Sequence, residues 1–527
     1  MTRTPTVQGV MVIGRGPDRR GLAAVLALAG MTLIAVVSVS LPVASTRHVA
    51  GGVGAARREA VWVVNAYLAA SVVAAPLASR LADRVGRRRA CLGCVAGFTI
   101  ATALCGTATS LAGLIAARLL QGLLGGILVP LAQASLADLA RPGRPSPLAG
   151  FSIALLIGPA FGPAIGGWLT DAYSWRVMFL AGVPVGLFAL AVCARWLPDD
   201  APERSTPGRF DWVGATLLVV GLACLEIVLT EGQVWDWFES RTVVVLSAGA
   251  AVALAAVAAR CLWGPDPLIR LDLLRDRHFL ACVALGAATT CVYVGSLSVI
   301  SRMVVGLMGY AAANVAELVA PAALTLLVLV PVLAAAAGGA GGRLVPVVGL
   351  VTLSGGALWL SAGNLLVAPS QVLWPRAVIV VGMTLTLSAV NAAALRGFVP
   401  SLRADAASVY NLFRNLGASV GVCLVTVAGE RGLQARLSRL TEAHLDALNP
   451  AVTERLRETA ARFLPGPAAG DPVTADFLAL KSLDDLRQQQ AQGLAYFDTL
   501  LLCGVAAAAL IPLIFLLDRR RVAQRPG

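Results

Sequence analysis

Residues 158–167 read Gly-Pro-Ala-Phe-Gly-Pro-Ala-Ile-Gly-Gly and lie inside an apolar run, 147–169, that is long enough to cross a bilayer as a helix. Glycines at every fourth position share one helix face, and this face of bare backbone allows a neighbouring helix to approach closely. The two prolines each remove a backbone hydrogen bond and are expected to bend the helix. The stretch therefore predicts a hinge helix between two bundle faces, with ordinary small-residue packing as the alternative. The positions that carry this prediction are Gly158, Gly162, Pro163, Gly166 and Gly167.

The whole chain has the composition of a membrane protein. Of its 527 residues, 57% are hydrophobic and 13% are charged, whereas soluble chains are about 45–50% apolar and about 25% charged. A helix needs roughly 20 apolar residues to span the hydrocarbon core of a bilayer. Fourteen runs meet this requirement and predict an all-α membrane protein with fourteen transmembrane helices. They are 21–43, 60–79, 89–108, 112–136, 147–169, 175–196, 211–230, 242–263, 278–300, 313–336, 345–366, 372–395, 405–428 and 494–517.

The net charge of +13 indicates membrane topology rather than nucleic-acid binding, because the arginines lie in short connections between the apolar runs. With the N-terminus inside, the inner connections hold most of these arginines. This bias predicts that both termini are cytoplasmic and that the chain is a multi-pass protein of the inner (plasma) membrane. One long outer connection, about 430–493, is nearly neutral, and we expect a surface cap there.

Several chemistries have no sequence signature in this chain. There is no phosphate-binding G-x-x-x-x-G-K-[ST] sequence, no clustered metal-ligand pattern and no nucleophile constellation. All ten cysteines lie in or beside apolar runs, which disfavours a disulfide framework. We therefore expect no enzymatic activity, no cofactor and no metal.

The connection between the second and third runs, residues 79–89, reads Ser-Arg-Leu-Ala-Asp-Arg-Val-Gly-Arg-Arg-Arg. A glycine suits a tight turn, and an aspartate among arginines can form charge-assisted hydrogen bonds that hold helix ends together. We interpret this segment as an inner gate, and simple anchoring of positive charge on the inner side is the alternative. The gate residues are Asp83, Arg84, Gly86, Arg87 and Arg88.

Arg118 lies within the fourth run and is followed by Gln121 and Gly122. A charge at the centre of a membrane helix costs about 2.5–3.5 kcal/mol on insertion scales, so it is retained where it faces a polar interior. Two roles remain open for Arg118. It either tunes a proton site or binds backbone carbonyl groups as a structural residue.

Together these motifs resemble those of the fourteen-span drug:proton antiporter branch of the major facilitator superfamily. Residues 79–89 are similar to its loop motif G-x-x-x-D-R-x-G-R-R/K, with Ser79 in place of the first glycine. Arg118 and the two residues named with it match R-x-x-Q-G, and residues 158–167 match the antiporter motif g-x-x-x-G-P-x-x-G-G. The resemblance covers nearly the whole chain and is specific for the family but not for a substrate.

The resemblance implies a major-facilitator fold whose two six-helix halves rock about a substrate site near the midplane. The halves are expected at 21–196 and 278–517, with a linker at 197–277 that contains two inserted helices. Residues 1–20 and 518–527 are expected in the cytoplasm. The resemblance also implies that Arg118 assists proton coupling. We expect a monomer whose partners are protons, the lipid bilayer and an amphipathic small molecule.

One departure concerns the acid that this family usually has in its first span, for which the chain has Leu33. Other acids are candidates for proton coupling, since a carboxyl group in a low-dielectric medium binds a proton more readily. Glu226 lies deep in the seventh run, and Glu317 lies near the outer start of the tenth, where Arg302 is a possible partner. A neutral carboxyl group that bonds to a neighbouring helix is the alternative for Glu226, because span seven is peripheral in the implied architecture.

Polar and aromatic residues within the spans are candidates for contact with substrate, although each is also explained by a packing hydrogen bond. They are Asn65, Tyr67, Gln133, Asn391 and Asn411. The predicted function is secondary active export of drugs, antibiotics or other amphipathic molecules by proton antiport and alternating access. A dedicated metabolite exporter or uniporter without standard proton coupling is one alternative. A transporter-like sensor that does not transport is another.

Overall fold

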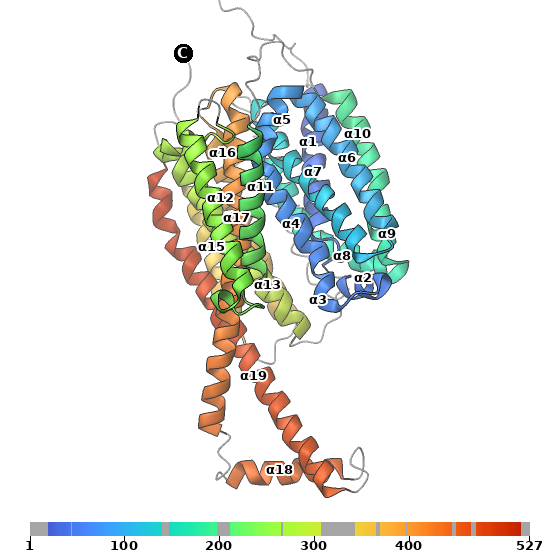
Figure 1. Ribbon diagram of the computed structural model, residues 1–527. Coiled ribbons are helices and arrows are strands. Elements are labelled where there is room, and N and C mark those ends of the chain that lie inside the picture. Colours follow the sequence, from blue (N-terminus) through green and yellow to red (C-terminus); the bar gives the residue numbers. More distant parts are fainter. Residues whose placement is uncertain are drawn as a thin grey trace, which may run out of the picture.

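The computed structural model describes residues 19–43, 45–139, 147–197, 211–264, 267–306, 343–364, 369–396, 398–444, 450–464 and 471–517. Within these ranges the regular structure is entirely helical, and the long helices lie side by side in a bundle (Figure 1). Twelve helices in the described ranges are long and apolar enough to cross a membrane. The all-helical membrane class predicted from the sequence is therefore confirmed.

The first six apolar runs form what we call the N-terminal half. Ser110 begins its longest helix by accepting a hydrogen bond of 3.2 Å from the backbone N–H of Gly113, as an N-cap residue does. Two short outer helices, α2 (Thr46–Val53) and α3 (Arg57–Ala60), connect the first two runs. The helices of the half are α1 (Arg19–Ser40), α4 (Trp62–Ala74), η1 (Ala75–Leu77), α5 (Ala78–Val85), α6 (Arg87–Thr107), α7 (Leu111–Asp138), α8 (Pro147–Ala172), α9 (Trp175–Leu180) and α10 (Gly182–Trp196).

Two helices follow this half and pack against each other: α11 (Trp212–Glu231) and α12 (Arg241–Trp263), joined by η2 (Trp237–Glu239). Asp211 caps α11 by accepting a hydrogen bond of 2.8 Å from the N–H of Gly214. Its carboxylate also accepts two hydrogen bonds from Arg260, at 2.7 and 3.0 Å. These bonds lower the pKa of Asp211, chiefly through Arg260. The pair therefore ties the start of α11 to the end of α12.

The remaining helices form the C-terminal half. The predicted span at 313–336, with Glu317, lies outside the described residues, whereas the predicted span at 147–169 coincides with α8. The helices of this half are η3 (Leu271–Arg275), α13 (Arg277–Gly306), α15 (Leu344–Ser361), α16 (Pro369–Leu395), α17 (Pro400–His444), α18 (Pro450–Phe463), α19 (Pro472–Ala509) and η4 (Ile511–Leu516).

The long outer connection expected at 430–493 is largely helical. Helices α17 and α19 continue beyond the bundle and are joined by α18, so that the three form a stalk (Figure 1). Arg436 of α17 donates hydrogen bonds of 2.9–3.0 Å to Asp498 of α19. The apolar runs end before the stalk begins, although the residues of the stalk still favour a helix. Hydropathy alone therefore ended the helix α17 too early.

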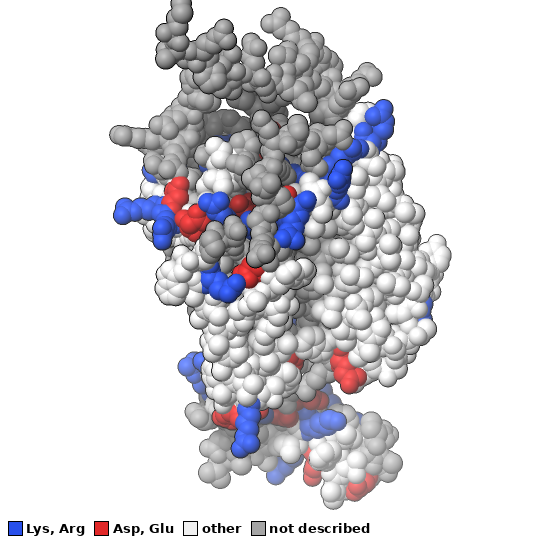
Figure 2. Space-filling model, turned by 45° about the horizontal axis from the view of Figure 1, so that its top comes forward, with Lys and Arg blue, Asp and Glu red and all other residues white. Residues whose placement is uncertain are grey.

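The surface of the bundle is suited to lipid. Figure 2 shows charged residues gathered toward the ends of the molecule, with most of the middle of this face uncharged. Large apolar side chains are exposed on the membrane helices, and they include Trp168 (62%), Phe188 (71%) and Trp263 (84%). Continuous exposed apolar surface of this kind is typical of a membrane-embedded face.

The glycine face of α8 packs directly on α1. A Cβ atom added to Gly162 would lie 2.0 Å from the Ser40 Oγ, and one added to Gly166 would lie 1.9 Å from the backbone oxygen of Leu41. The hydroxyl of Ser40 donates a hydrogen bond of 2.9 Å to the carbonyl of Gly158. The expectation of a bare face for close packing is therefore confirmed, and the partner is the first helix of the same half.

Replacing Gly166 by alanine is expected to lower the free energy of unfolding by about 1–3 kcal/mol, because the added methyl group collides with backbone that cannot move aside. The thermal unfolding temperature of the purified protein in detergent measures this effect. Gly30 of α1 is the matched control, since a Cβ there meets nothing within 4 Å. Equal unfolding temperatures for Gly166→Ala and Gly30→Ala would contradict the packing described here.

Candidate functional site

The ends of the two halves that carry the predicted inner gate are joined by charged and polar contacts. Asp138, at the end of α7, forms an ion pair with Arg87 at the start of α6 and a second one, at 2.8 Å, with Arg403 of α17. Asp405, also on α17, is 8% exposed. One carboxylate of the N-terminal half therefore holds arginines from both halves.

The segment predicted as a gate lies at this junction. Gly86 has φ +87°, a conformation that favours glycine, and it separates α5 from α6. Arg80 donates to the carbonyl oxygens of Pro267 and Leu268, before η3. Asp83 pairs at 3.9 Å with Arg80 of its own helix, whereas Asp138 pairs with an arginine from each half. Within the gate segment, Arg88 donates a bond of 2.6 Å to the carbonyl of Ala194, and Arg84 lies in the last turn of α5.

Arg118 is fully buried between α7, α4 and α1. Its guanidinium donates to the carbonyl oxygens of Val63 (2.8 Å) and Ser38 (3.0 Å) and to the Gln121 Oε1 (2.6 Å). The Tyr67 ring lies 4.5 Å from the guanidinium carbon, which is close enough for a cation–π contact. These contacts correspond to the structural alternative, and the proton-tuning role stays a prediction.

Tyr67 was predicted to contact substrate. It is 1% exposed, and its hydroxyl donates a hydrogen bond of 2.8 Å to the carbonyl of Ala35. In this conformation it therefore packs α4 against α1 and against Arg118.

Gly167 is buried and Pro163 is half-buried in α8. Helix α8 contacts α1 on one side and α16 of the other half on another, and Phe161 packs against the apolar core of the C-terminal half. The helix therefore lies between the halves, as the sequence predicted.

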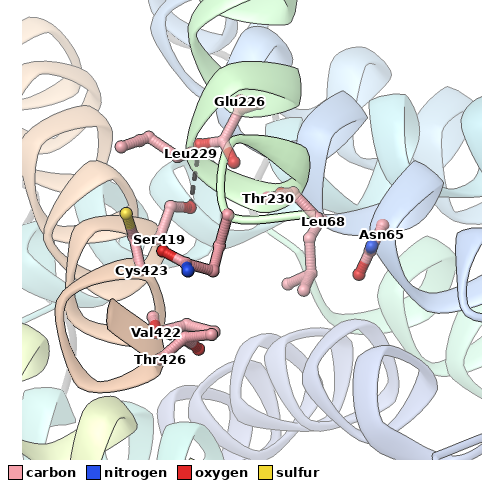
Figure 3. A pocket seen from close by; sticks show the side chains of 10 residues that line it. Asn65, Leu68, Glu226, Leu229, Thr230, Ser419, Val422, Cys423 and Thr426 are labelled. Atoms are coloured by element: carbon pink, nitrogen blue, oxygen red, sulfur yellow. Dashed lines mark hydrogen bonds between the residues drawn. The ribbon is translucent and has the colours of Figure 1, made fainter. Parts of the chain in front are cut away.

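Glu226 lies at a seam between three helices (Figure 3). It is 4% exposed, and its Oε1 accepts a hydrogen bond of 2.8 Å from the hydroxyl of Ser419 on α17. Helix α11 packs against both α4 and α17, so it contacts both halves.

A small pocket opens beside this carboxylate. Its volume is about 100 Å³, which is enough for several water molecules. Its polar lining includes Asn65, Thr230 and Gln233 as well as the Glu226–Ser419 pair. Asn65, predicted as a substrate contact, thus shares a pocket with the buried acid. Such a pocket suits water and protons better than a large organic molecule.

A second polar contact joins the halves nearer the inner gate. The Asn411 Nδ2 donates to the Gln133 Oε1, and both side chains are fully buried. The structure therefore brings together two of the predicted substrate contacts, from α17 and α7. Asn391 is also fully buried, on α16.

Several residues at these junctions were not identified from the sequence. Asp138 ends the fourth apolar run on the inner side, and this position was the available signal. Nothing in the sequence indicated that Ser419 lies beside Glu226, because 193 residues separate them. The missed residues are Asp138, Arg403, Asp405 and Ser419, together with the buried Arg376 and the role of Arg414.

Residues 24–422 match the sequence profile described as Major Facilitator Superfamily. The chain belongs to this superfamily. It is therefore a multi-pass membrane protein of a transporter superfamily, and the superfamily part of the predicted resemblance is confirmed.

Relatives within this superfamily are named for export and resistance. The fatty acid resistance protein FarB of Neisseria gonorrhoeae is 28% identical over 409 residues, which cover 77% of this chain and 79% of FarB. The multidrug export protein EmrB of Escherichia coli K12 is 27% identical over 431 residues, which cover 81% of this chain and 83% of that protein. The colistin resistance protein EmrB of Acinetobacter baumannii is 27% identical, with 85% of this chain and 88% of that protein aligned.

Solved structures share the fold at low sequence identity. The human organic anion transporter MFSD10 has a TM-score of 0.56 and 17% identity, with 96% of this chain and 100% of that chain covered. The proton:xylose symporter XylE has a TM-score of 0.57 and 11% identity, with 94% of this chain and 97% of that chain covered. The helices described above therefore adopt the major-facilitator fold.

Replacing Asp138 by asparagine is expected to favour an inward-open conformation by about 1–3 kcal/mol, because the change removes the charge that holds Arg87 and Arg403. Distances between spin labels at the inner ends of α5 and α17 measure the shift. Asp83→Asn is the matched control, since Asp83 pairs within its own helix. The inner-gate assignment is wrong if Asp83→Asn opens the inner face and Asp138→Asn does not.

Proposed function

We propose that this chain is a proton-driven exporter of amphipathic small molecules, such as drugs or antibiotics, that works by alternating access. The names of its relatives, which refer to multidrug export and to resistance, support export. The charged junction at the inner ends of the halves supports a conformation closed toward the cytoplasm. We further propose fourteen spans with both termini cytoplasmic, a location in the inner membrane and a monomeric state.

The observation that carries proton coupling is the burial of Glu226 beside a pocket that has room for water. Glu226 is buried, it belongs to an inserted helix that contacts both halves, and it lies beside a pocket that has room for water. The first span has Leu33 where the family usually has an acid, so another carboxyl group must accept the proton. Glu226 is placed to gain or lose a proton as the halves move apart.

The coupling cycle follows from this placement. With its charge neutralised by a proton, Glu226 can remain in the closed seam at little electrostatic cost, whereas the ionised group favours contact with water. Opening of the seam therefore accompanies loss of the proton, and closing accompanies its uptake. Each proton that enters the cell releases about 2.3 kcal/mol per 100 mV of membrane potential.

A dedicated metabolite exporter or uniporter without standard proton coupling remains the second candidate, and the presence of Leu33 favours it. Substrate flux into inverted membrane vesicles, with and without an imposed pH gradient, separates the two candidates. Flux that the gradient does not change would contradict proton antiport.

Glu226→Gln is expected to lower transport driven by a pH gradient by about tenfold or more, because glutamine keeps the size and hydrogen-bonding ability of the residue but cannot carry a proton. Substrate exchange without a gradient should persist, since it does not require net proton transfer. Glu231→Gln, on the same helix but outside the pocket, is the control. Unchanged gradient-driven transport by Glu226→Gln would eliminate Glu226 as the proton carrier.

A further inference from the structure

We propose that the exported substrate is an organic anion, and that Arg414 binds its negative group. The inference rests on the proposed export function and specifies the chemical class of its substrate. It comes from three buried arginines of the membrane helices, Arg414, Arg118 and Arg376.

Arg414 lies on α17 between two residues that join this helix to other parts of the bundle. Asn411, one turn before it, bonds to Gln133 of the N-terminal half, and Ser419, farther along the helix, bonds to Glu226. Arg414 is 6% exposed. Its Nη2 donates a bond of 3.3 Å to the neutral Asn415 Oδ1, whereas its Nη1 is buried and has no acceptor among the described residues.

Arg118 in the N-terminal half is also a buried arginine with a guanidinium nitrogen that has no acceptor among the described residues. Its three acceptors are two carbonyl groups and an amide, and its Nη2 is buried without an acceptor in the described part of the chain. The six apolar runs of this half contain neither aspartate nor glutamate. The apolar runs of this half therefore supply no acid to pair with Arg118.

Arg376 of α16 is the third such group. It is 4% exposed, and its Nη1 is buried with no acceptor among the residues that the structure describes. Fifteen residues separate Arg376 from Asn391, the same spacing that separates Arg118 from Gln133. The fourth span of each half thus places an arginine and an amide at matching positions, as expected for parallel repeats.

An anion would supply hydrogen-bond acceptors to the guanidinium N–H groups of these arginines that have none among the described residues. A guanidinium N–H group in a low-dielectric interior needs an acceptor, and carboxylate, sulfonate and phosphate groups present paired oxygen atoms that match it. A cationic substrate would instead approach several positive charges in a medium that screens them weakly. Ionised Glu226 offsets only one of these three positive charges. The buried charges therefore favour an amphipathic anion over an amphipathic cation.

Transport of two matched probes tests this assignment. Octanesulfonate and octyltrimethylammonium have the same chain length and fixed, opposite charges, so neither crosses a bilayer in a neutral form. The purified full-length protein is reconstituted in liposomes, and uptake of each radiolabelled probe is measured under an imposed pH gradient. We expect uptake of octanesulfonate to exceed that of octyltrimethylammonium by about tenfold or more.

Variants of Arg414 then test whether this residue binds the anionic group of the substrate. Arg414→Gln is expected to raise the half-saturating concentration of octanesulfonate by about tenfold or more, and Arg414→Lys, which keeps the charge, is expected to recover part of the loss. Arg436→Gln, in the stalk, is the control for loss of an arginine. Size-exclusion profiles and unfolding temperatures show whether each variant is folded. If Arg414→Gln does not fold, the affinity of Arg414→Lys for octanesulfonate is compared with that of the wild type instead.

The outcomes separate this inference from the proposed function. Preference of the wild-type protein for octyltrimethylammonium would overturn the assignment of an anionic substrate and leave export intact. Equal affinity of wild type and Arg414→Lys or Arg414→Gln for octanesulfonate would overturn the role of Arg414. If the wild type carries neither probe and its expression in a pump-deficient host changes resistance to no compound, the proposed export function itself fails.

Discussion

Close contact between bare helix backbones is the constraint on which the rest of this structure depends. At Gly162 and Gly166, α8 approaches α1 so closely that a single methyl group would collide. Gly417 and Gly421 of α17 approach α13 in the same way, with a built Cβ at 2.3 and 2.1 Å from backbone oxygens. Contacts of this kind depend on van der Waals packing rather than on the hydrophobic effect, which is weak between helices in lipid. They make each half a tightly packed body.

The junction between the halves has a different chemistry. Beside the apolar contact of Phe161, it contains an ion pair of Arg403 with Asp138 and a hydrogen bond of Asn411 with Gln133. Ser419 adds a polar contact between α17 and Glu226 of α11. Water or a bound molecule can replace each of these partners, whereas nothing replaces lost contact between two glycine faces. Motion is therefore expected at the polar junction, and the glycine contacts keep each half intact while it moves.

The sequence predicted much of this architecture because membrane helices follow from local composition. Apolar runs located the spans, and the glycine spacing in α8 identified a face for close packing. The partners across the junction could not be predicted, because Asp138 and Arg403 are 265 residues apart and their pairing depends on how the halves meet. The sequence likewise did not indicate that α11 contacts both α4 and α17. The extension of α17 and α19 into the stalk was not predicted, because these helices leave the membrane and hydropathy does not follow a solvated helix.

The continuity of α17 has a mechanical consequence. This helix has 45 residues and is therefore about 67 Å long at the usual rise of 1.5 Å per residue. One end holds Arg403 beside the inner gate, and the other carries the stalk, which is fastened to α19 through Arg436 and Asp498. A stiff rod of this length acts as a lever, so that a small tilt at the Arg403 end becomes a larger sweep of the stalk tip.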